Sequence, residues 1–338
     1  MTTFFLNRLA TEPHALAFAG QSTPWPVALA DQTTDPSLDE ALRGHVAAAG
    51  RLLTPVAADL LATTGRPVDL FGFAPNPARL GAAADATASV EGVALTQLGA
   101  LLDLEHLGYS VAQAKPLAVL GHSQGVLAVH MTRAIEAAGS IEAAGTTLDE
   151  ILAVAALIGA AGTRRVRELG LNPKYGEASP MLSVKGATRA QVEALVARVN
   201  NARGPISIAV TNSDNHHVLS GYPEDLAAFA LEAEREHQHQ AKLREQKLHG
   251  GTVFNPTLEY LEVTLPFHSP LMADAVEQTV AWAGACGFDQ KRTRALAEEV
   301  LLNHVDWNAR VKALFDDADP SKLWIVDLGP GNTLGKLI

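Results

Sequence analysis

Hydrophobic and polar positions along the first 177 residues form short apolar runs that alternate with longer amphipathic stretches. The apolar runs at 15–20 and 116–121 predict buried strands. Apolar residues at helical spacing predict helices at 38–63, 91–107, 124–138 and 147–169. Because strands and helices alternate, this part of the chain predicts a parallel sheet with helices on both faces.

The pattern changes between residues 178 and 265. Strands are predicted at 181–185, 206–212, 216–221 and 259–265, and helices at 188–200 and 223–248. This βαββαβ order is typical of a small ferredoxin-like domain. A later strand at 323–327 belongs again to the first sheet. The sequence therefore predicts a large α/β domain, residues 1–177 and 266–338, with a ferredoxin-like domain, residues 178–265, inserted in it.

Composition and charge restrict the classes of function. The 338 residues are 47% hydrophobic and 19% charged, which is typical of a globular protein rather than a disordered one. The net charge of −11 argues against general nucleic-acid binding, and no uninterrupted apolar run predicts a membrane span. The single Cys286 excludes internal disulfides. With no basic leader before an apolar core, the chain is predicted to be cytoplasmic.

The most informative motif is Gly121-His122-Ser123-Gln124-Gly125, which directly follows the predicted strand 116–121. Glycines flank the serine, so the chain can turn sharply and the next helix can pack closely. This arrangement is typical of a nucleophile elbow, with Ser123 at the strand tip and the N-terminus of the next helix ready to stabilise an oxyanion. A serine nucleophile needs a base, and the chain has 12 histidines that could supply it.

Most of these histidines are expected to be bystanders. His122 neighbours the serine, but at an elbow it points away from the nucleophile, so a packing role is predicted. His216-His217 and His237-x-His239 suggest a metal, yet neither pair has a nearby cysteine or an HExxH motif. We therefore expect no metal site.

The motif Gly-His-Ser-Gln-Gly resembles the one found in acyltransferases that load acyl groups from coenzyme A onto acyl carrier protein. Four further segments resemble that family in the same order, namely 17–22, Thr96-Gln97, 266–269 and 327–331. The run Ile-Gly-Ala-Ala-Gly at 158–162 is most similar to the acetyl-loading domain of actinobacterial type I fatty acid synthases. The resemblance implies that the large domain is α/β-hydrolase-like.

The same resemblance implies the roles of individual residues. Ser123 would be the nucleophile and His268 its base, with a rate that rises through an ordinary histidine pKa of about 6–7. Asp306 would orient His268, through its backbone carbonyl as in the family or, alternatively, through its side chain. The oxyanion hole would be formed by the N–H groups of Gln21 and Gln124.

The acyl pocket implied by the family is lined by Ile158, Phe267, Asn212 and Gln97. Malonyl-loading members carry an arginine at the place of Ile158, where it binds the malonate carboxylate. A carboxylate beside Ile158 would be desolvated without a partner, so we expect acetyl, unless Arg164 reaches the pocket. The implied substrate is acetyl-CoA, with no permanently bound cofactor. The implied partners are acyl carrier protein and other domains of a fatty acid synthase, with neither nucleic acid nor membrane.

Three alternatives stay open. A malonyl- or palmitoyl-type transacylase of the same family would differ in the acyl group. An α/β-hydrolase-type thioesterase shares the elbow, but it would have an acid between serine and histidine and an HGGG-like loop. A scaffolding domain would keep the fold without the activity.

Overall fold

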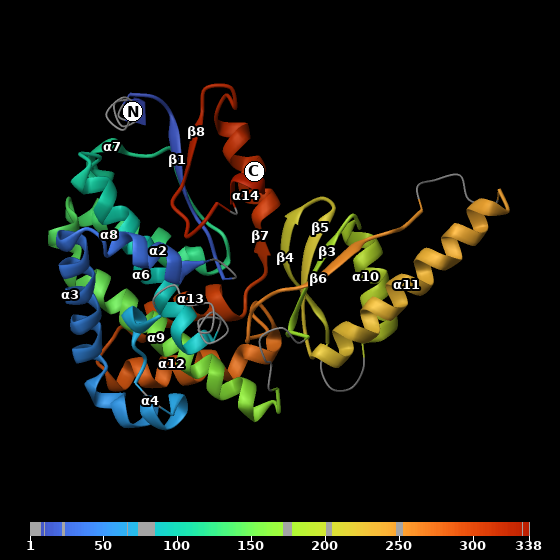
Figure 1. Ribbon diagram of the computed structural model, residues 1–338, viewed down its shortest axis with the longest axis horizontal. Helices are drawn as coiled ribbons and strands as arrows, with labels where there is room; N and C mark the ends of the chain where they lie inside the picture. Colours follow the sequence, from blue (N-terminus) through green and yellow to red (C-terminus); the bar gives the residue numbers. More distant parts are fainter. Residues whose placement is uncertain are drawn as a thin grey trace.

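The computed structural model describes residues 8–9, 11–21, 24–65, 67–73, 85–171, 178–200, 205–247, 253–332 and 334–337. Figure 1 shows two lobes, one built of helices around a parallel sheet and one built of an antiparallel sheet with two long helices. The second lobe lies between α9 and α12 in the chain. The predicted domain boundary at residue 177 lies outside the described residues.

The parallel sheet has three strands in the order β2-β1-β8, namely β1 (His14–Phe18), β2 (Ala118–Gly121) and β8 (Trp324–Asp327). All five residues of β1 are buried, because this strand is central and covered on both faces. Phe18 aligns with Gly121, and Ala17 aligns with Asp327, so the three strands end at one edge. Ligand sites of parallel sheets lie at this carboxyl edge. The predicted α/β fold with a parallel sheet is confirmed.

The helices of this lobe differ from the prediction in number and length. The helix predicted at 38–63 is two helices, α3 (Pro36–Leu52) and α4 (Ala57–Thr64), separated by the 3-10 turn η1 (Thr54–Val56). The other helices in the described part of the lobe are α2 (Trp25–Gln32), α6 (Ala86–His106), α7 (Val111–Ala114), α8 (Val126–Ala138), α9 (Ile141–Glu168), α12 (Ala273–Ala285), α13 (Gln290–Leu301) and α14 (Trp307–Asp317). The sequence pattern missed α2, α7 and the last three.

Helix α9 is the central helix of the large lobe. It packs against α3, α4, α6, α8, α12 and α13. Among the described helices, α9 is by itself long and apolar enough to cross a membrane. The bent α3–α4 pair is long and apolar enough only if both helices are counted as one span. Most of the apolar part of α9 is buried inside the fold, which is typical of a core helix.

The small lobe has the predicted βαββαβ order. Its elements are β3 (Met181–Lys185), α10 (Arg189–Val199), β4 (Ser207–Ser213), β5 (His216–Ser220), α11 (Pro223–Glu245) and β6 (Thr257–Tyr260). The sheet order is β6-β3-β5-β4-β7, in which the first four strands pair antiparallel and β7 (Val305–Asp306) joins β4 in parallel. A strand from the C-terminal part of the chain therefore completes this sheet. The ferredoxin-like class of the lobe stays a prediction.

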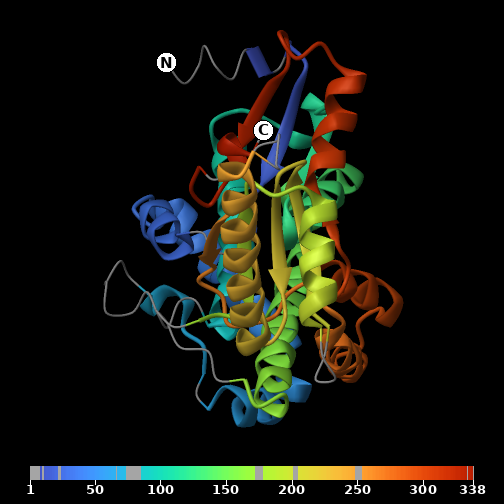
Figure 2. The ribbon, with the colours of Figure 1, turned by 90° about the vertical axis from the view of Figure 1, so that its right-hand side faces the viewer.

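The two faces of the small sheet serve different cores. Leu182 and Leu219 belong to the apolar cluster under α10 and α11, whereas Met181 and Val218 belong to the core of the large lobe. Strand alternation explains this division. Figure 2 shows α10 and α11 side by side on the outer face. The inner face is therefore turned toward the large lobe.

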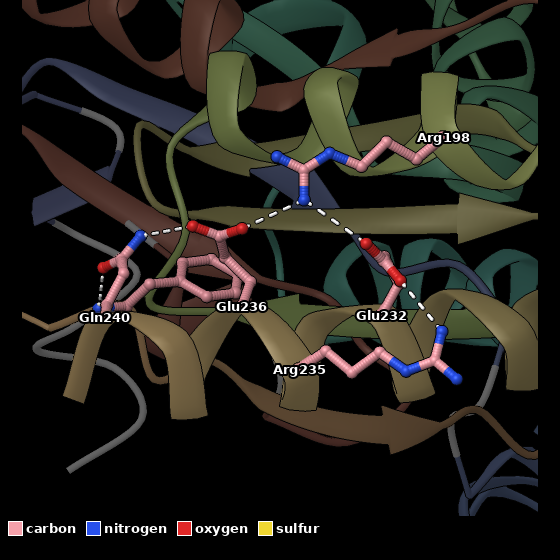
Figure 3. Close-up of polar contacts among 6 residues, drawn as sticks. Arg198, Glu232, Arg235, Glu236 and Gln240 are labelled. Atoms are coloured by element: carbon pink, nitrogen blue, oxygen red, sulfur yellow. Dashed lines mark hydrogen bonds and ion pairs between the residues drawn. The ribbon is translucent and has the colours of Figure 1, made fainter. Parts of the chain in front are cut away.

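Charged side chains link the two outer helices. The Arg198 guanidinium on α10 lies 3.3 Å from a Glu232 carboxylate oxygen and 2.9 Å from one of Glu236, both on α11 (Figure 3). Gln240 donates to Glu236 and accepts from the backbone N–H of Phe254, which lies shortly before β6. Exposed ion pairs contribute little stability, so the apolar cluster beneath them holds the lobe together.

Candidate active site

The elbow has the backbone conformation that the motif predicts. Ser123 follows β2 at a φ of +54° and opens the 3-10 turn η4 (Ser123–Gly125), which continues into α8. A Cβ atom at Gly125 would collide with the backbone carbonyl of Phe18 in β1. Only glycine therefore allows α8 to start this close to the sheet. A positive φ at a serine is strained and is typical of functional sites.

His268 lies directly opposite this serine. Its Nε2 is 2.7 Å from the Oγ of Ser123, and the side chain is buried. His268 also has a positive φ, +56°, in the segment between β6 and α12. The strand predicted at 259–265 ends at Tyr260 instead, so the chain has left the sheet before it reaches His268. The structure thus brings the predicted nucleophile and base within hydrogen-bond distance.

The group that orients His268 differs from the prediction. The Nδ1 of His268 lies 2.8 Å from the backbone carbonyl oxygen of Asn303, so Asp306 is the wrong residue of this segment. The Asp306 side chain caps α14 by accepting from the N–H of Ala309, and its backbone pairs with Thr211 in the small sheet. Within the described residues, no carboxylate bonds to the imidazole.

The C-terminal end of α13 also binds the residue that follows His268. The N–H of Ser269 donates to the carbonyl of Leu301, 3.1 Å away, and Leu301 is the last residue of α13. The carbonyls at a helix C-terminus carry partial negative charge, which favours a cation nearby. This helix end can therefore stabilise the imidazolium that forms when His268 takes a proton.

Burial has the largest effect on the base. It lowers the pKa of His268 to about 3, and the positive fields of His122, His304 and Arg310 act in the same direction. The hydrogen bond to Asn303 opposes this shift. The imidazole is consequently neutral at pH 7, which is the form that can accept a proton from Ser123.

The two residues predicted to form the oxyanion hole are connected through their side chains. The amide of Gln21 donates to the side-chain oxygen of Gln124, whose own amide donates to the carbonyl of Val90. A Cβ atom at Gly20 would lie 2.8 Å from the Cβ of Ser123, so the turn after β1 touches the elbow. This pairing fixes the turn against the helix start. That their backbone N–H groups bind an oxyanion stays a prediction.

Gln97 was predicted to line the acyl pocket, which stays a prediction, and its amide holds the edge of the sheet. The side-chain nitrogen donates to the carbonyls of Ala19, at 2.7 Å, and Gly329, at 3.0 Å. Ala19 follows β1 and Gly329 follows β8. The buried amide of Gln97 thus ties together the turns that leave two neighbouring strands.

Asn212 was also predicted to border the acyl pocket. Its Oδ1 accepts a hydrogen bond from the Nε2 of His122, 2.7 Å away, and the His122 ring packs edge-on against Trp307 at 5.3 Å. Burial lowers the pKa of His122. The predicted packing role of His122 agrees with these contacts, and the pairing with Asn212 was not predicted. It joins the small sheet to the elbow.

The other two predicted pocket residues are apolar and buried. Ile158 on α9 is fully buried, and Phe267 precedes the base. Arg164, the alternative partner for malonate, has its guanidinium at the surface, 3.0 Å from Glu168 and 2.9 Å from the side-chain oxygen of Gln278. Among the residues described, no group of three His, Cys, Asp or Glu side chains is placed to hold a metal ion.

Parts of this chain are similar in sequence to fatty acid synthases. Residues 180–260 match the family model of the fatty acid synthase central AT domain. The chain is 26% identical over 251 residues to the fatty acid synthase beta subunit TOXC of Cochliobolus carbonum, covering 64% of this chain and 12% of that protein. It is 30% identical over 168 residues to fatty acid synthase 2 of Mycosarcoma maydis, covering 46% of this chain and 4% of that protein.

The fold is also that of a solved transacylase. The malonyl CoA-acyl carrier protein transacylase of Coxiella burnetii superposes with a TM-score of 0.63 at 17% identity, covering 96% of this chain and 90% of that one. The chain spans only a small part of the two synthase polypeptides, so the match concerns one region of them. Residues 180–260 therefore resemble the central AT domain of fatty acid synthases, and the chain shares its fold with a solved transacylase.

Proposed function

We propose that this chain transfers a short acyl group from a coenzyme A thioester to the phosphopantetheine thiol of an acyl carrier protein. The observation that carries the proposal is the 2.7 Å contact between Ser123 Oγ and His268 Nε2. It occurs at a strained elbow in a fold shared with a transacylase. A neutral, buried histidine beside a serine is the arrangement that makes a hydroxyl nucleophilic.

In the first half-reaction, His268 Nε2 takes the proton of Ser123 as Oγ attacks the thioester carbonyl carbon. A bond forms between Oγ and carbon, and the carbonyl π electrons move to oxygen. When the tetrahedral intermediate collapses, the carbon–sulfur bond breaks and His268 gives its proton to the coenzyme A thiolate. The product is an acyl ester on Ser123.

In the second half-reaction, His268 deprotonates the carrier thiol, which attacks the ester carbonyl. The carbon–oxygen bond to Ser123 breaks, and Oγ recovers the proton. Because one product leaves before the second substrate reacts, the kinetics are ping-pong. The N–H groups of Gln21 and Gln124 would hold the oxyanion in both steps.

We further propose that acetyl is preferred over malonyl. Ile158 is uncharged and buried, and Arg164, the arginine considered for malonate, is bonded to Glu168 and Gln278 at the surface. Arg310, whose positive field reaches His268, donates to the backbone carbonyl of Gly121. A malonate carboxylate would lose its hydration without gaining a partner. Malonyl transfer is the alternative, because the solved relative is named for it.

The proposal includes the surroundings of the reaction. Coenzyme A enters as a substrate rather than as a bound cofactor, and other domains of a cytoplasmic fatty acid synthase supply the carrier. The resemblance of residues 180–260 to a synthase domain supports that context. A thioesterase is less favoured, since a backbone carbonyl rather than a carboxylate accepts the Nδ1–H of His268.

Incubation with radiolabelled acetyl-CoA or malonyl-CoA, followed by addition of holo acyl carrier protein, tests the proposal. Transfer predicts a label that persists on Ser123 and then moves to the carrier. Rapid loss of the label to water would indicate a hydrolase, and no label from either thioester would indicate a scaffold. Preferential labelling by malonyl-CoA would contradict the acetyl assignment alone.

A further inference from the structure

The carbonyl that orients His268 lies in a short connection between two helices. This connection, residues 302–306, joins α13 to α14 and includes β7. At its start, the N–H groups of Leu302 and Asn303 donate to the carbonyl of Glu298, at 2.9 and 2.7 Å. At its end, Val305 pairs with Val210 in the small sheet. His304 stands between these two attachments.

The side chain of His304 contacts the small sheet at two points. Its Nδ1 lies 2.9 Å from the backbone carbonyl oxygen of Ile208, and its Nε2 lies 3.4 Å from Thr211 Oγ1. One neutral tautomer satisfies both contacts, because Nδ1–H donates to the carbonyl while Nε2 accepts from the hydroxyl. The residue as a whole is exposed, so burial does not force these contacts on it. Both attachments belong to β4.

The position of His304 in the chain connects these contacts to the base. The carbonyl of Asn303 and the Cα of His304 belong to the same peptide unit, which is planar. Fixing the backbone of His304 therefore fixes the direction of the Asn303 oxygen. That oxygen is the acceptor 2.8 Å from His268 Nδ1.

We propose that His304 is a positioning residue, whose 2.9 Å bond to Ile208 in β4, supported by the longer contact with Thr211, aims the Asn303 carbonyl at the catalytic base. The proposal rests on the proposed function only in that His268 acts as the base of Ser123. Through this arrangement, strand β4 of the small lobe supports the histidine side of the site. The β7 pairing with β4 is the competing explanation, since it could hold the connection without the imidazole.

Substitutions at His304 separate the two explanations. The amide of His304→Asn occupies the place of Nδ1 and keeps a donor for Ile208, whereas that of His304→Gln reaches toward Thr211 instead. His304→Ala removes both contacts and leaves the β7 pairing intact. His239→Ala, at an exposed histidine of α11, is the matched control.

Two measurements report on the pair of Ser123 and His268 without the use of a thioester. A fluorophosphonate probe measures the reactivity of Ser123, and proton NMR of selectively labelled histidine detects the hydrogen-bonded Nδ1 proton of His268, assigned by its loss in His268→Gln. If the proposed function is wrong, the unaltered protein will transfer no acyl group from a thioester. The two readouts would still test the role of His304 in that case.

We expect His304→Ala to slow serine labelling by about 10- to 100-fold and to broaden the Nδ1 proton signal. His304→Asn should restore both and His304→Gln should not, and the control should resemble the unaltered protein. Unchanged labelling and an unchanged signal in His304→Ala would overturn the proposal in favour of β7. If His304→Ala does not fold, equal behaviour of the Asn and Gln variants would overturn it.

Discussion

Ser123 and His268 are 145 residues apart in the chain, and both have a left-handed backbone conformation where their side chains meet at 2.7 Å. Each such conformation costs about 1–3 kcal/mol in a residue other than glycine. Close packing of η4 on β1 maintains it at Ser123, and the bond from Ser269 to Leu301 maintains it beside His268. The surrounding fold thus imposes the conformations that let the two side chains meet.

Two substitutions of Ser123 distinguish its chemical role from the backbone strain at its positive φ. Ser123→Ala and Ser123→Gly should both fail to form an acyl-enzyme, because each lacks the attacking oxygen. The glycine variant should be more stable than the alanine variant by about 1 kcal/mol, since glycine adopts a positive φ without penalty. Denaturant unfolding of the two variants measures this difference. Acyl labelling of either one would assign the nucleophile elsewhere.

The acylation rate should change little between pH 8 and pH 5. The base acts in its neutral form, and because burial lowers the pKa of His268 to about 3, that form persists far below pH 6.5. This expectation replaces the midpoint of about 6–7 that an ordinary histidine would give. Initial rates of acyl-enzyme formation across this range test it. A fall by half near pH 6.5 would show that the base is not desolvated as the structure indicates.

Protein stability should depend on pH through the same group. The pKa of His268 is lower in the folded state than in the unfolded state, so below pH 6.5 the unfolded chain binds a proton that the folded chain does not. As the pH is lowered from 6.5 to about 3, the free energy of unfolding should therefore decrease, by about 1.4 kcal/mol per pH unit for this histidine. His268→Asn should remove that part of the slope. An identical slope in the variant would refute the assignment.

Gln97→Leu should weaken both stability and catalysis. It removes the side-chain donor of the buried Ala19 carbonyl, at a cost of about 1–3 kcal/mol, whereas the Gly329 carbonyl keeps the backbone N–H of Ala19 as a donor. Ala19 lies two residues before Gln21, whose N–H is proposed to bind the oxyanion. The turn after β1 should therefore loosen and acylation should slow. Thermal unfolding and single-turnover labelling measure the two effects. Gln113→Leu, at an exposed glutamine, is the control, and equal losses there would remove the special role of Gln97.

Ile158→Arg should shift the enzyme from acetyl toward malonyl. A guanidinium at this buried position offers the carboxylate a charged partner worth about 1–3 kcal/mol of discrimination. Without malonate the arginine is unpaired, so acetyl transfer and stability should both fall. Initial rates with both thioesters decide the outcome. Arg164→Ala should leave the ratio unchanged, and a loss of malonyl transfer there would show that Arg164 reaches the pocket.

Features that depend on neighbouring residues could be predicted from the sequence. The apolar run before Ser123, together with its flanking glycines, predicted the strand, the sharp turn and the next helix, because each follows from backbone sterics within a few residues. The βαββαβ order was predicted for the same reason, from hydrophobic periodicity. Helices α12, α13 and α14 lie in stretches whose pattern gave no prediction.

Features that depend on distant residues could not be predicted in this way. Gln21 and Gln124 are 103 residues apart, and nothing in either segment indicates that their side chains pair. Which carbonyl of residues 303–306 faces His268 depends on where α13 ends and how β7 joins β4, so the family resemblance implied Asp306 where the structure has Asn303. The family resemblance supplied the pair of Ser123 and His268, and only the folded chain shows their contact.

Intact-protein mass spectrometry of the chain mixed with acetyl-CoA, followed by addition of holo acyl carrier protein, tests the acyl-Ser123 mechanism most directly. This mechanism predicts that the protein gains one acetyl group, that peptide mapping places it on Ser123, and that the group moves to the carrier thiol when the carrier is added. The Ser123→Ala protein should gain nothing under the same conditions. Acetylation of the carrier without any acetylated form of the chain, or an acetyl group located on a residue other than Ser123, would contradict the proposed mechanism.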